Sequence, residues 1–337
     1  MLSYPSGRRG RLALLPLLFL AFLLFVGPSA ASIGDQLHEF RDCVEICKNE
    51  NCGADAEHQT HIPLHRRLLL WTCPAECDYT CQHIITARRQ SAVPPAPVVQ
   101  FHGKWPFHRL LGMQEPASVV FSLGNLAAHY HGLNHKILPL VPASYTMRPF
   151  YVFLARLGMV TWFLSAVFHT RDFPLTEQLD YFAAGASVLY GMYYAVVRLW
   201  RLDRPTPGAR RGLRAWTGFC ALLYAGHVAY LKLWRWDYTY NTAACVVCGF
   251  VQNLLWSWYS WTRYASTKKS WAAWPGIVVV WVMMAMSLEL FDFAPIWGSI
   301  DAHSLWHLGT IAPAVLWYNF LVKDAQEDIA SSARLKA

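Results

Sequence analysis

Charged residues are scarce in this sequence. Only 15% of its 337 residues are Asp, Glu, Lys or Arg, whereas 55% are hydrophobic and 15% are aromatic. An ordinary soluble domain carries more charge and less apolar surface, so this composition excludes one. The sequence also contains no P-loop, no dinucleotide-binding fingerprint and no N-x-S/T sequon, and therefore lacks the usual signatures of nucleotide binding and N-glycosylation.

What the sequence has instead is a series of apolar runs, each near twenty residues long. Such runs predict an all-α membrane protein with a bundle of seven transmembrane helices. The formal charge of +8 does not indicate nucleic-acid binding, because the basic residues cluster between the apolar runs. The predicted spans are 116–136, 150–170, 176–198, 213–233, 242–262, 273–291 and 303–322.

The N-terminus has the pattern of a secretory signal peptide. Arg8, Arg9 and Arg11 precede an apolar stretch at 12–26, and small residues follow at 27–32. We predict a signal peptide at 1–31; the alternative is an uncleaved membrane anchor. In either case the residues that follow enter the lumen of the secretory pathway.

Six of the nine cysteines lie in the next segment, 32–113, which we interpret as a small luminal domain. Because that compartment is oxidising, an even set of cysteines predicts disulfides, with about 15 possible pairings. The spacing is largely i, i+4, which places cysteines on one face of each of two short helices. A zinc knuckle is the alternative. The six residues are Cys43, Cys47, Cys52, Cys73, Cys77 and Cys81.

The loops between the spans predict the orientation. Basic residues are concentrated at 198–214 and 263–269, which places both loops in the cytosol by the positive-inside rule. Seven spans that follow a luminal segment give the same result. The membrane domain is then 114–323, and residues 324–337 form a cytosolic tail.

Two distant motifs predict a single site. Ser165 and His169 end the second span, Asp180 begins the third, and His303 and His307 begin the seventh. With the predicted topology, all five residues lie at a similar depth on the luminal side. Polar residues at membrane depth are costly and usually functional, so we interpret the set as one site.

The residue types indicate a zinc hydrolase. His303 and His307 are spaced i, i+4 and face one metal ion, and His169 supplies a third ligand. Three protein ligands and a water are typical of catalytic zinc, which lowers the pKa of that water to about 7. Asp180 is the candidate general base and acid, and Ser165 the candidate donor to the oxyanion.

Several stretches resemble the Per-like family of GPI-anchor remodelling proteins, the family of post-GPI-attachment-to-proteins factor 3. The stretches are Lys104–Phe107, Gln114–Ser118, Phe168–Asp172, Leu175–Phe182, Asp237–Asn241, Leu288–Phe293 and Asp301–His307. This family belongs to the CREST superfamily of seven-span hydrolases. The superfamily pattern of one serine, one aspartate and three histidines matches the five residues above.

The resemblance implies an activity and a location. The implied reaction removes the unsaturated sn-2 acyl chain of GPI-anchored proteins, a phospholipase A2 reaction that leaves a lyso-GPI. Family members work in the endoplasmic reticulum in fungi and in the Golgi in animals. We therefore expect an integral protein of the endoplasmic reticulum membrane, with the Golgi membrane as the alternative. GPI-anchored proteins and membrane lipid are its expected partners.

Five further polar residues are predicted to orient the histidines or to contact the substrate: Glu115, Asp237, Asn241, Asp292 and Asp301. Glu115 precedes Pro116 at the start of the first span, where a carboxylate suits a helix N-terminus. A second ion such as Ca²⁺ near Glu115 is a further hypothesis.

Two other functions stay open at this point. One is a non-enzymatic receptor or chaperone for GPI-anchored proteins, in which the metal is structural. The other is a hydrolase of ceramide-type amides that shares the site but not the substrate. The oligomeric state is not predicted.

Overall fold

The computed structural model describes residues 32–53, 62–288 and 291–334. Helices dominate these ranges, and they contain no β-strand, only three isolated bridges. The prediction of an all-α protein is therefore confirmed. The predicted signal peptide at 1–31 lies outside the described residues.

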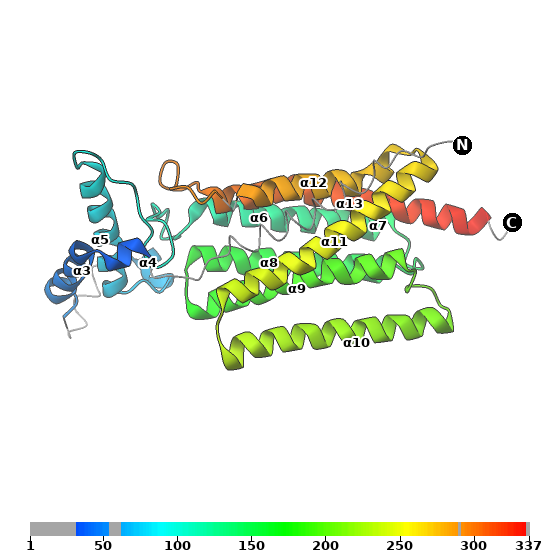
Figure 1. The fold of residues 1–337 in the computed structure, drawn as a ribbon, viewed down its shortest axis with the longest axis horizontal. Coiled ribbons are helices and arrows are strands. Elements are labelled where there is room, and N and C mark those ends of the chain that lie inside the picture. Colours follow the sequence, from blue (N-terminus) through cyan, green and yellow to red (C-terminus); the bar gives the residue numbers. More distant parts are fainter. Residues whose placement is uncertain (1–31, 54–61, 289–290, 335–337) are drawn as a thin grey trace, which may run out of the picture.

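Long helical segments run side by side along the long axis of the molecule (Figure 1). Prolines occupy the first or second position of five of these helices, where the missing N–H costs no hydrogen bond. The segments are α6 (Pro116–His131), continued by η2 (Gly132–Ile137) and α7 (Leu138–Leu140); α8 (Arg148–Thr170); α9 (Pro174–Leu199); α10 (Pro207–Ala229), continued by η3 (Tyr230–Trp234); α11 (Tyr238–Thr267); η4 (Ser270–Ala273), leading into α12 (Trp274–Ser287); and α13 (Ala302–Arg334).

Four helical segments have the length and composition needed to cross a membrane. They are Arg148–Thr170, Pro174–Leu199, Ser270–Ser287 and Ala302–Ala333. The prediction of a multi-span membrane protein is thus confirmed, whereas the count of seven spans stays a prediction. The remaining segments are shorter or more polar: α6 has 16 residues, and α10 begins with several arginines.

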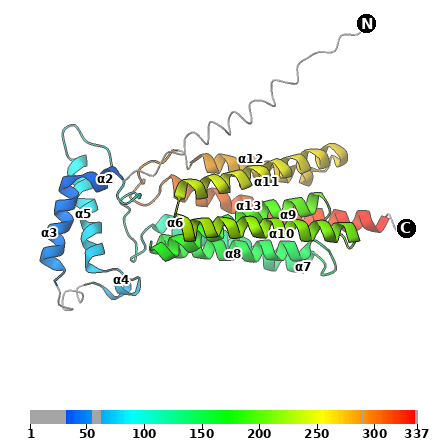
Figure 2. The same cartoon turned by 60° about the horizontal axis from the view of Figure 1, so that its bottom comes forward.

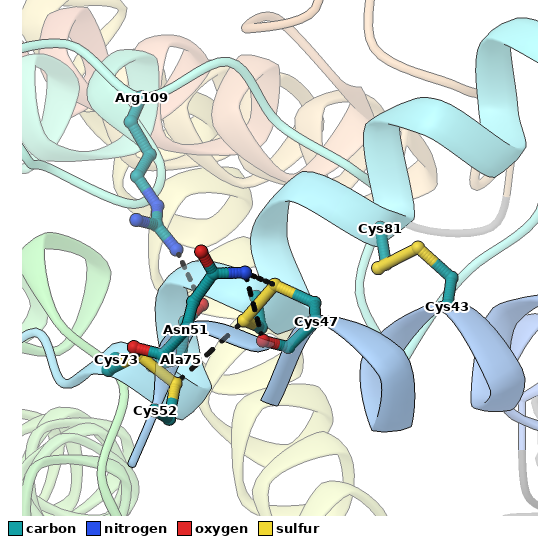
Figure 3. The surroundings of a disulfide bond; sticks show 9 residues. Cys43, Cys47, Asn51, Cys52, Cys73, Ala75, Cys81 and Arg109 are labelled. Atoms are coloured by element: carbon teal, nitrogen blue, oxygen red, sulfur yellow. Dashed lines mark hydrogen bonds between the residues drawn. A yellow bond between two sulfur atoms is a disulfide. The ribbon is translucent and has the colours of Figure 1, made fainter. Parts of the chain in front are cut away.

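A small group of helices lies at one end of the bundle (Figure 2). It consists of α2 (Ile33–Gln36), α3 (His38–Asn51), α4 (Leu64–Leu68) and α5 (Cys73–Gln90). The disulfides Cys43–Cys81, Cys47–Cys77 and Cys52–Cys73 join α3 to α5 (Figure 3). The predicted disulfide framework on two helices is confirmed, and since these six sulfurs are bonded to one another, they are not available to a zinc knuckle.

Aromatic and basic side chains join this cysteine-rich group to the bundle. The guanidinium of Arg109 lies 3.2 Å from the ring centre of Trp71 and 2.8 Å from a Glu76 oxygen. Arg171, in the loop between α8 and α9, lies 3.7 Å from the same Trp71 ring. Desolvation lowers the pKa of Arg109 to about 10 although Glu76 opposes this shift. The α8–α9 loop is therefore fixed against the disulfide-linked helices.

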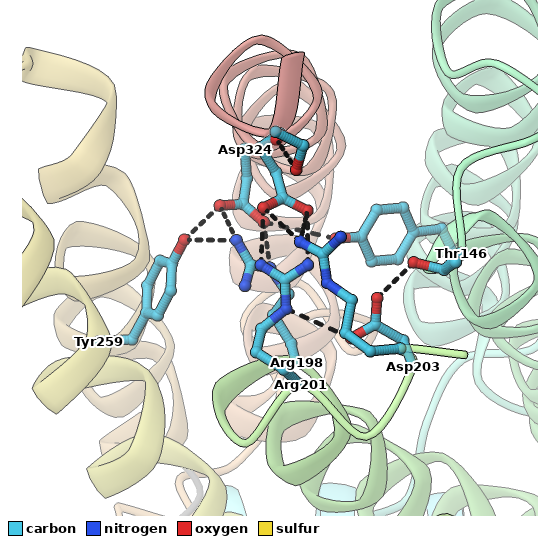
Figure 4. A network of polar contacts seen from close by, with 10 residues as sticks. Thr146, Arg198, Arg201, Asp203, Tyr259 and Asp324 are labelled. Carbon is cyan, nitrogen blue, oxygen red and sulfur yellow. Dashed lines mark hydrogen bonds and ion pairs between the residues drawn. The ribbon is translucent and has the colours of Figure 1, made fainter. Parts of the chain in front are cut away.

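The opposite end of the bundle contains a buried ionic network (Figure 4). The guanidinium of Arg198 on α9 donates to both Asp324 oxygens on α13, at 2.7 and 2.8 Å, and the Tyr259 hydroxyl on α11 donates to Asp324 as well. Arg201 contacts Asp328 through two hydrogen bonds of 2.6 and 2.7 Å. These contacts hold α9, α11 and α13 together at the end remote from the candidate site.

Candidate metal centre

Three histidines meet at the end of the bundle that carries the cysteine-rich helices. His169 lies in the last turn of α8, and His303 and His307 lie in the first two turns of α13. One ring nitrogen from each of the three lies within 4.8 Å of the others. The Nε2 atoms of His169 and His303 are 3.4 Å apart. The structure thus brings together the three residues that the sequence predicts as metal ligands.

Asp301 fixes the start of α13. Its carboxylate accepts a hydrogen bond of 2.9 Å from the Ser304 backbone N–H, and the Ser304 hydroxyl accepts one of 3.0 Å from the Asp301 N–H. This reciprocal pair is a capping box, which holds the first turn of the helix. Asp301 therefore positions the turn that carries His303, and this contact is consistent with the prediction that Asp301 orients the histidines.

Glu115 holds the ring of His169. Its Oε2 atom lies 2.7 Å from His169 Nδ1, and its Oε1 atom accepts a hydrogen bond from the Lys104 ammonium. Lys104 Nζ also lies 3.0 Å from Asp172 Oδ2. Burial alone would raise the pKa of Glu115, but Lys104 and His169 together hold that pKa well below its usual range. Glu115 is therefore a buried carboxylate with two partners, and the hypothesis of a second ion stays a prediction.

Ser165 lies in a hydrogen-bonded chain with a residue that sequence reasoning missed. The Oγ atom of Ser122 on α6 lies 3.1 Å from Ser165 Oγ and 3.0 Å from His307 Nδ1. Ser122 is fully buried, and Ser165 and His307 are nearly so. No spacing motif could identify Ser122, because its two partners are 43 and 185 residues away in the sequence.

Asp180 faces the same cavity as the three histidines and Ser165. It lies in the second turn of α9, directly after the loop that follows His169, and it is half-buried. All five residues of the predicted set therefore line one continuous space. A carboxylate in this place is available to a water molecule or a substrate near the histidines.

The cavity has a volume of about 1410 Å³. Its lining follows α8 from His169 to Leu154 and α13 from His303 to Tyr318. At 1.5 Å per residue each of these stretches spans about 22 Å along the helix axis. The wall of the cavity includes a group of apolar side chains: Leu154, Val188, Val278, Val279, Val282, Met286 and Ala314.

The other predicted residues lie around the end of the cavity nearest the cysteine-rich helices. Asp237 caps α11 by accepting a hydrogen bond of 3.0 Å from the Tyr240 N–H, and Asn241 is buried one turn later. Asp292 accepts hydrogen bonds from the side chains of Gln100, at 2.9 and 3.1 Å, and Trp105, at 2.9 Å. Asp237, Asn241 and Asp292 all line the cavity.

The histidine cluster fits a metal ion. The Nδ1 atoms of His169 and His307 both have polar partners, so their Nε2 atoms remain for coordination. Three histidine nitrogens within 4.8 Å of one another match a site with three protein ligands and an open position. The arrangement is consistent with a bound metal ion without identifying which one.

Comparison with known proteins identifies the family. The model of the Per1-like family matches residues 63–325. This chain belongs to the Per1-like family. It is 39% identical over 328 residues to a protein named PER1 homolog from Schizosaccharomyces pombe, which covers 95% of this chain and 97% of that protein. It is also 37% identical over 304 residues to the human protein named GPI-specific phospholipase A2-like PGAP3, with 88% of this chain and 90% of that protein covered.

A mouse relative with the same name, GPI-specific phospholipase A2-like PGAP3, is 38% identical over 318 residues, 92% of this chain and 94% of that protein. The resemblance drawn from the sequence motifs is therefore confirmed. The part of the chain that the Per1-like model matches includes the candidate site from Lys104 to His307.

Proposed function

We propose that this Per1-like protein remodels GPI anchors by zinc-dependent hydrolysis of the sn-2 acyl ester, which leaves a lyso-GPI on the anchored protein. The names of its mouse and human relatives support a phospholipase of this substrate class. The observation that carries the proposal is the position of the three histidines and Asp180 on a long cavity with an apolar wall. A lipid ester needs this combination, because its reactive carbonyl is polar and its acyl chain is not.

The size of the cavity supports a lipid substrate. Pockets for small molecules usually have volumes of about 300–1000 Å³, and this one is larger. An acyl chain that lies along α8 and α13 places its methylenes against the valines of α12 and its ester near the histidines. The apolar wall resembles the bilayer hydrocarbon that the chain leaves, so the chain enters the cavity without exposing its methylenes to water.

His169, His303 and His307 would hold the zinc ion, which would supply a Lewis acid for the ester carbonyl and would lower the pKa of a nearby water molecule. Asp180 would take a proton from the water that attacks the ester carbonyl and return it to the departing lyso-lipid oxygen. Ser165 donates a hydrogen bond to the oxyanion that develops on the carbonyl oxygen.

The orientation follows from the charge of the loops. With the arginine-rich α9–α10 connection in the cytosol, the histidine cluster and the disulfide-linked helices face the lumen. GPI-anchored proteins are exposed on that side. We propose the endoplasmic reticulum membrane as the location, with the Golgi membrane as the alternative.

The test measures metal content and acyl release in one preparation. Wild type, His303→Ala and the control His38→Ala are purified in detergent, and bound zinc is quantified. His38 is exposed on α3, away from the cavity, and so controls for the loss of a histidine. Each protein is then incubated with a purified GPI-anchored protein, and the released fatty acid and the lyso-GPI are measured by mass spectrometry.

We expect His303→Ala to lose zinc and acyl release together, whereas His38→Ala keeps both. Zinc lost with release intact would mean that the metal is structural and that the chemistry lies elsewhere. Release of a fatty acid from ceramide rather than from the GPI lipid would favour the amide hydrolase. A wild type that binds zinc but leaves both lipids intact would favour the receptor or chaperone.

A further inference from the structure

Among the residues that the structure describes, the Ser122 hydroxyl links Ser165 to His307 by hydrogen bonds. It lies on α6, whereas the five predicted site residues lie on α8, α9 and α13. Its side chain is 0% exposed, so its hydroxyl has no solvent partner. The direction of its hydrogen bonds is therefore set by its two protein neighbours.

The chemistry of His307 determines that direction. A neutral imidazole carries its proton on one nitrogen and a lone pair on the other. If His307 uses Nε2 for the metal, the proton is on Nδ1, and Ser122 Oγ, 3.0 Å away, accepts it together with the backbone carbonyl of Ser118. The proton of the Ser122 hydroxyl then has Ser165 Oγ, 3.1 Å away, as its acceptor. Ser165 accepts from Ser122 and keeps its own proton for another partner.

We propose that Ser122 is a positioning residue with two effects: it holds the Nδ1–H tautomer of His307, and it leaves the Ser165 hydroxyl proton free to point into the cavity. The second effect rests on the proposed function, because the free proton is the one that Ser165 donates to the oxyanion. The first effect concerns the metal site alone.

Neighbouring contacts keep Ser122 in register with α13. Asn125, one turn later on α6, donates a hydrogen bond of 2.7 Å to the backbone carbonyl of His307. The Thr310 hydroxyl on α13 donates one of 3.1 Å to the Asn125 side-chain oxygen. These bonds fix the backbone of His307 relative to α6, so its ring meets the Ser122 hydroxyl at a constant distance.

The chain offers a matched control for the test. Ser118 lies one turn before Ser122 on α6, is 1% exposed, and has a buried hydroxyl without a hydrogen-bond partner in the described structure. Ser118→Ala therefore removes the same atom from the same helix without changing the chain of hydrogen bonds. Ser122→Cys keeps a weak donor and acceptor in nearly the same volume and is the conservative variant.

The first measurement is zinc affinity of the metal-free protein, by titration against a competing chelator and without substrate. Loss of a group that orients a metal-binding histidine typically weakens metal affinity 10–100-fold. We expect Ser122→Ala to weaken zinc binding about tenfold, Ser122→Cys to lie in between, and Ser118→Ala to match wild type. Equal affinity of Ser122→Ala and Ser118→Ala would overturn the effect on His307, as would a wild type that binds no zinc.

The second measurement is acyl release at saturating zinc, as kcat and KM for Ser122→Ala, Ser165→Ala and the double variant. Loss of an oxyanion donor lowers kcat about 10²–10³-fold, so we expect this of Ser165→Ala and a smaller loss, with KM nearly unchanged, for Ser122→Ala. Because Ser122 acts through Ser165, adding Ser122→Ala to Ser165→Ala should lower kcat by less than about a further twofold.

Losses that multiply in the double variant would overturn the effect on Ser165. A wild type that binds zinc but hydrolyses no ester would overturn the proposed function instead, and the zinc affinities would still decide the effect on His307.

Discussion

Replacing Lys104 by Met tests how the site tolerates a buried carboxylate. Lys104 pairs with Glu115 and with Asp172, and its ammonium lies 4.2 Å from the ring centre of Phe168. The side chain of Glu115 is only 6% exposed. Without Lys104, the Glu115 charge keeps His169 as a hydrogen-bond partner but loses its counterion.

The size of the effect follows from the alternatives open to Glu115. Removing one partner of a buried ion pair costs about 3–5 kcal/mol if the other partner stays charged. Glu115 can instead take up a proton, which at pH 7 costs about 3.4 kcal/mol for a group with an ordinary pKa near 4.5. Because the cheaper route prevails, we expect Lys104→Met to lower the free energy of unfolding by about 3–3.4 kcal/mol at pH 7.

The pH dependence has a definite sign. In wild type the pKa of Glu115 is lowered, so its stabilising contribution is fully present above the ordinary pKa and is lost only as the pH falls through the lowered pKa. In Lys104→Met, by contrast, Glu115 takes up a proton, and the cost of that proton falls as the pH approaches the ordinary pKa near 4.5. The difference in stability between wild type and Lys104→Met should therefore shrink as the pH falls from 7 towards about 4.5.

Denaturation by SDS in detergent micelles, followed by circular dichroism, measures these differences. Lys48→Met, an exposed lysine on α3, is the control for loss of one surface charge. Adding Glu115→Gln to Lys104→Met should recover most of the lost stability, since no buried charge remains. The reasoning is refuted if the double variant is no more stable than Lys104→Met, or if Lys104→Met matches Lys48→Met.

Three further predictions follow from contacts outside the site. The hydrogen bond to Asp78 is the main cause of the raised pKa of His102. This contact therefore stabilises the cysteine-rich helices at low pH, and the stabilisation is lost as the pH rises through that raised pKa. Thermal unfolding at pH 6 and pH 8.5 should show the difference, and His102→Asn should abolish it. Arg198→Met should cost about 3–5 kcal/mol because it leaves Asp324 buried and charged, and adding Asp324→Asn should restore much of this in an SDS titration. Cys43→Ser should destabilise the α3–α5 pair by about 2–4 kcal/mol, seen as faster proteolysis of that region; equal rates would contradict it.

The cysteines show how far sequence reasoning reaches. The i, i+4 spacing places Cys43 and Cys47 on one face of a helix, and this is confirmed in α3. The pairing itself depends on the direction of the second helix. Because α5 runs antiparallel to α3, Cys43 meets Cys81 and Cys47 meets Cys77. That direction is set by how the intervening chain folds, which local spacing does not determine.

The histidines were predicted from spacing and topology together. The i, i+4 pair His303 and His307 is local to α13, so periodicity alone identifies it. The addition of His169 required the inference that α8 ends where α13 begins. A count of apolar runs gives that inference, because each run reverses the direction of the chain across the membrane. The structure brings these three histidines together, as that inference requires.

Lys104 shows what spacing misses. It lies eleven residues before Glu115 in a segment without regular helix, where a lysine is usually exposed. Its burial depends on Phe168 and Asp172, which come from the end of α8 and the loop beyond it. Likewise, the C-terminal residues expected as a tail continue α13 to Arg334, since Asp324 pairs with Arg198 on α9 and Asp328 pairs with Arg201 just beyond α9.

The predicted ligands lie on α8 and α13, yet α6 and the residue before it orient two of them. Glu115, immediately before α6, holds His169, and Ser122, two turns into α6, holds His307. A polar group at this depth is costly unless it is paired, so each imidazole that turns one nitrogen towards a metal needs a partner for the other. Since neither partner is a ligand, small changes in the packing of α6 should alter metal affinity while all three ligands remain in place.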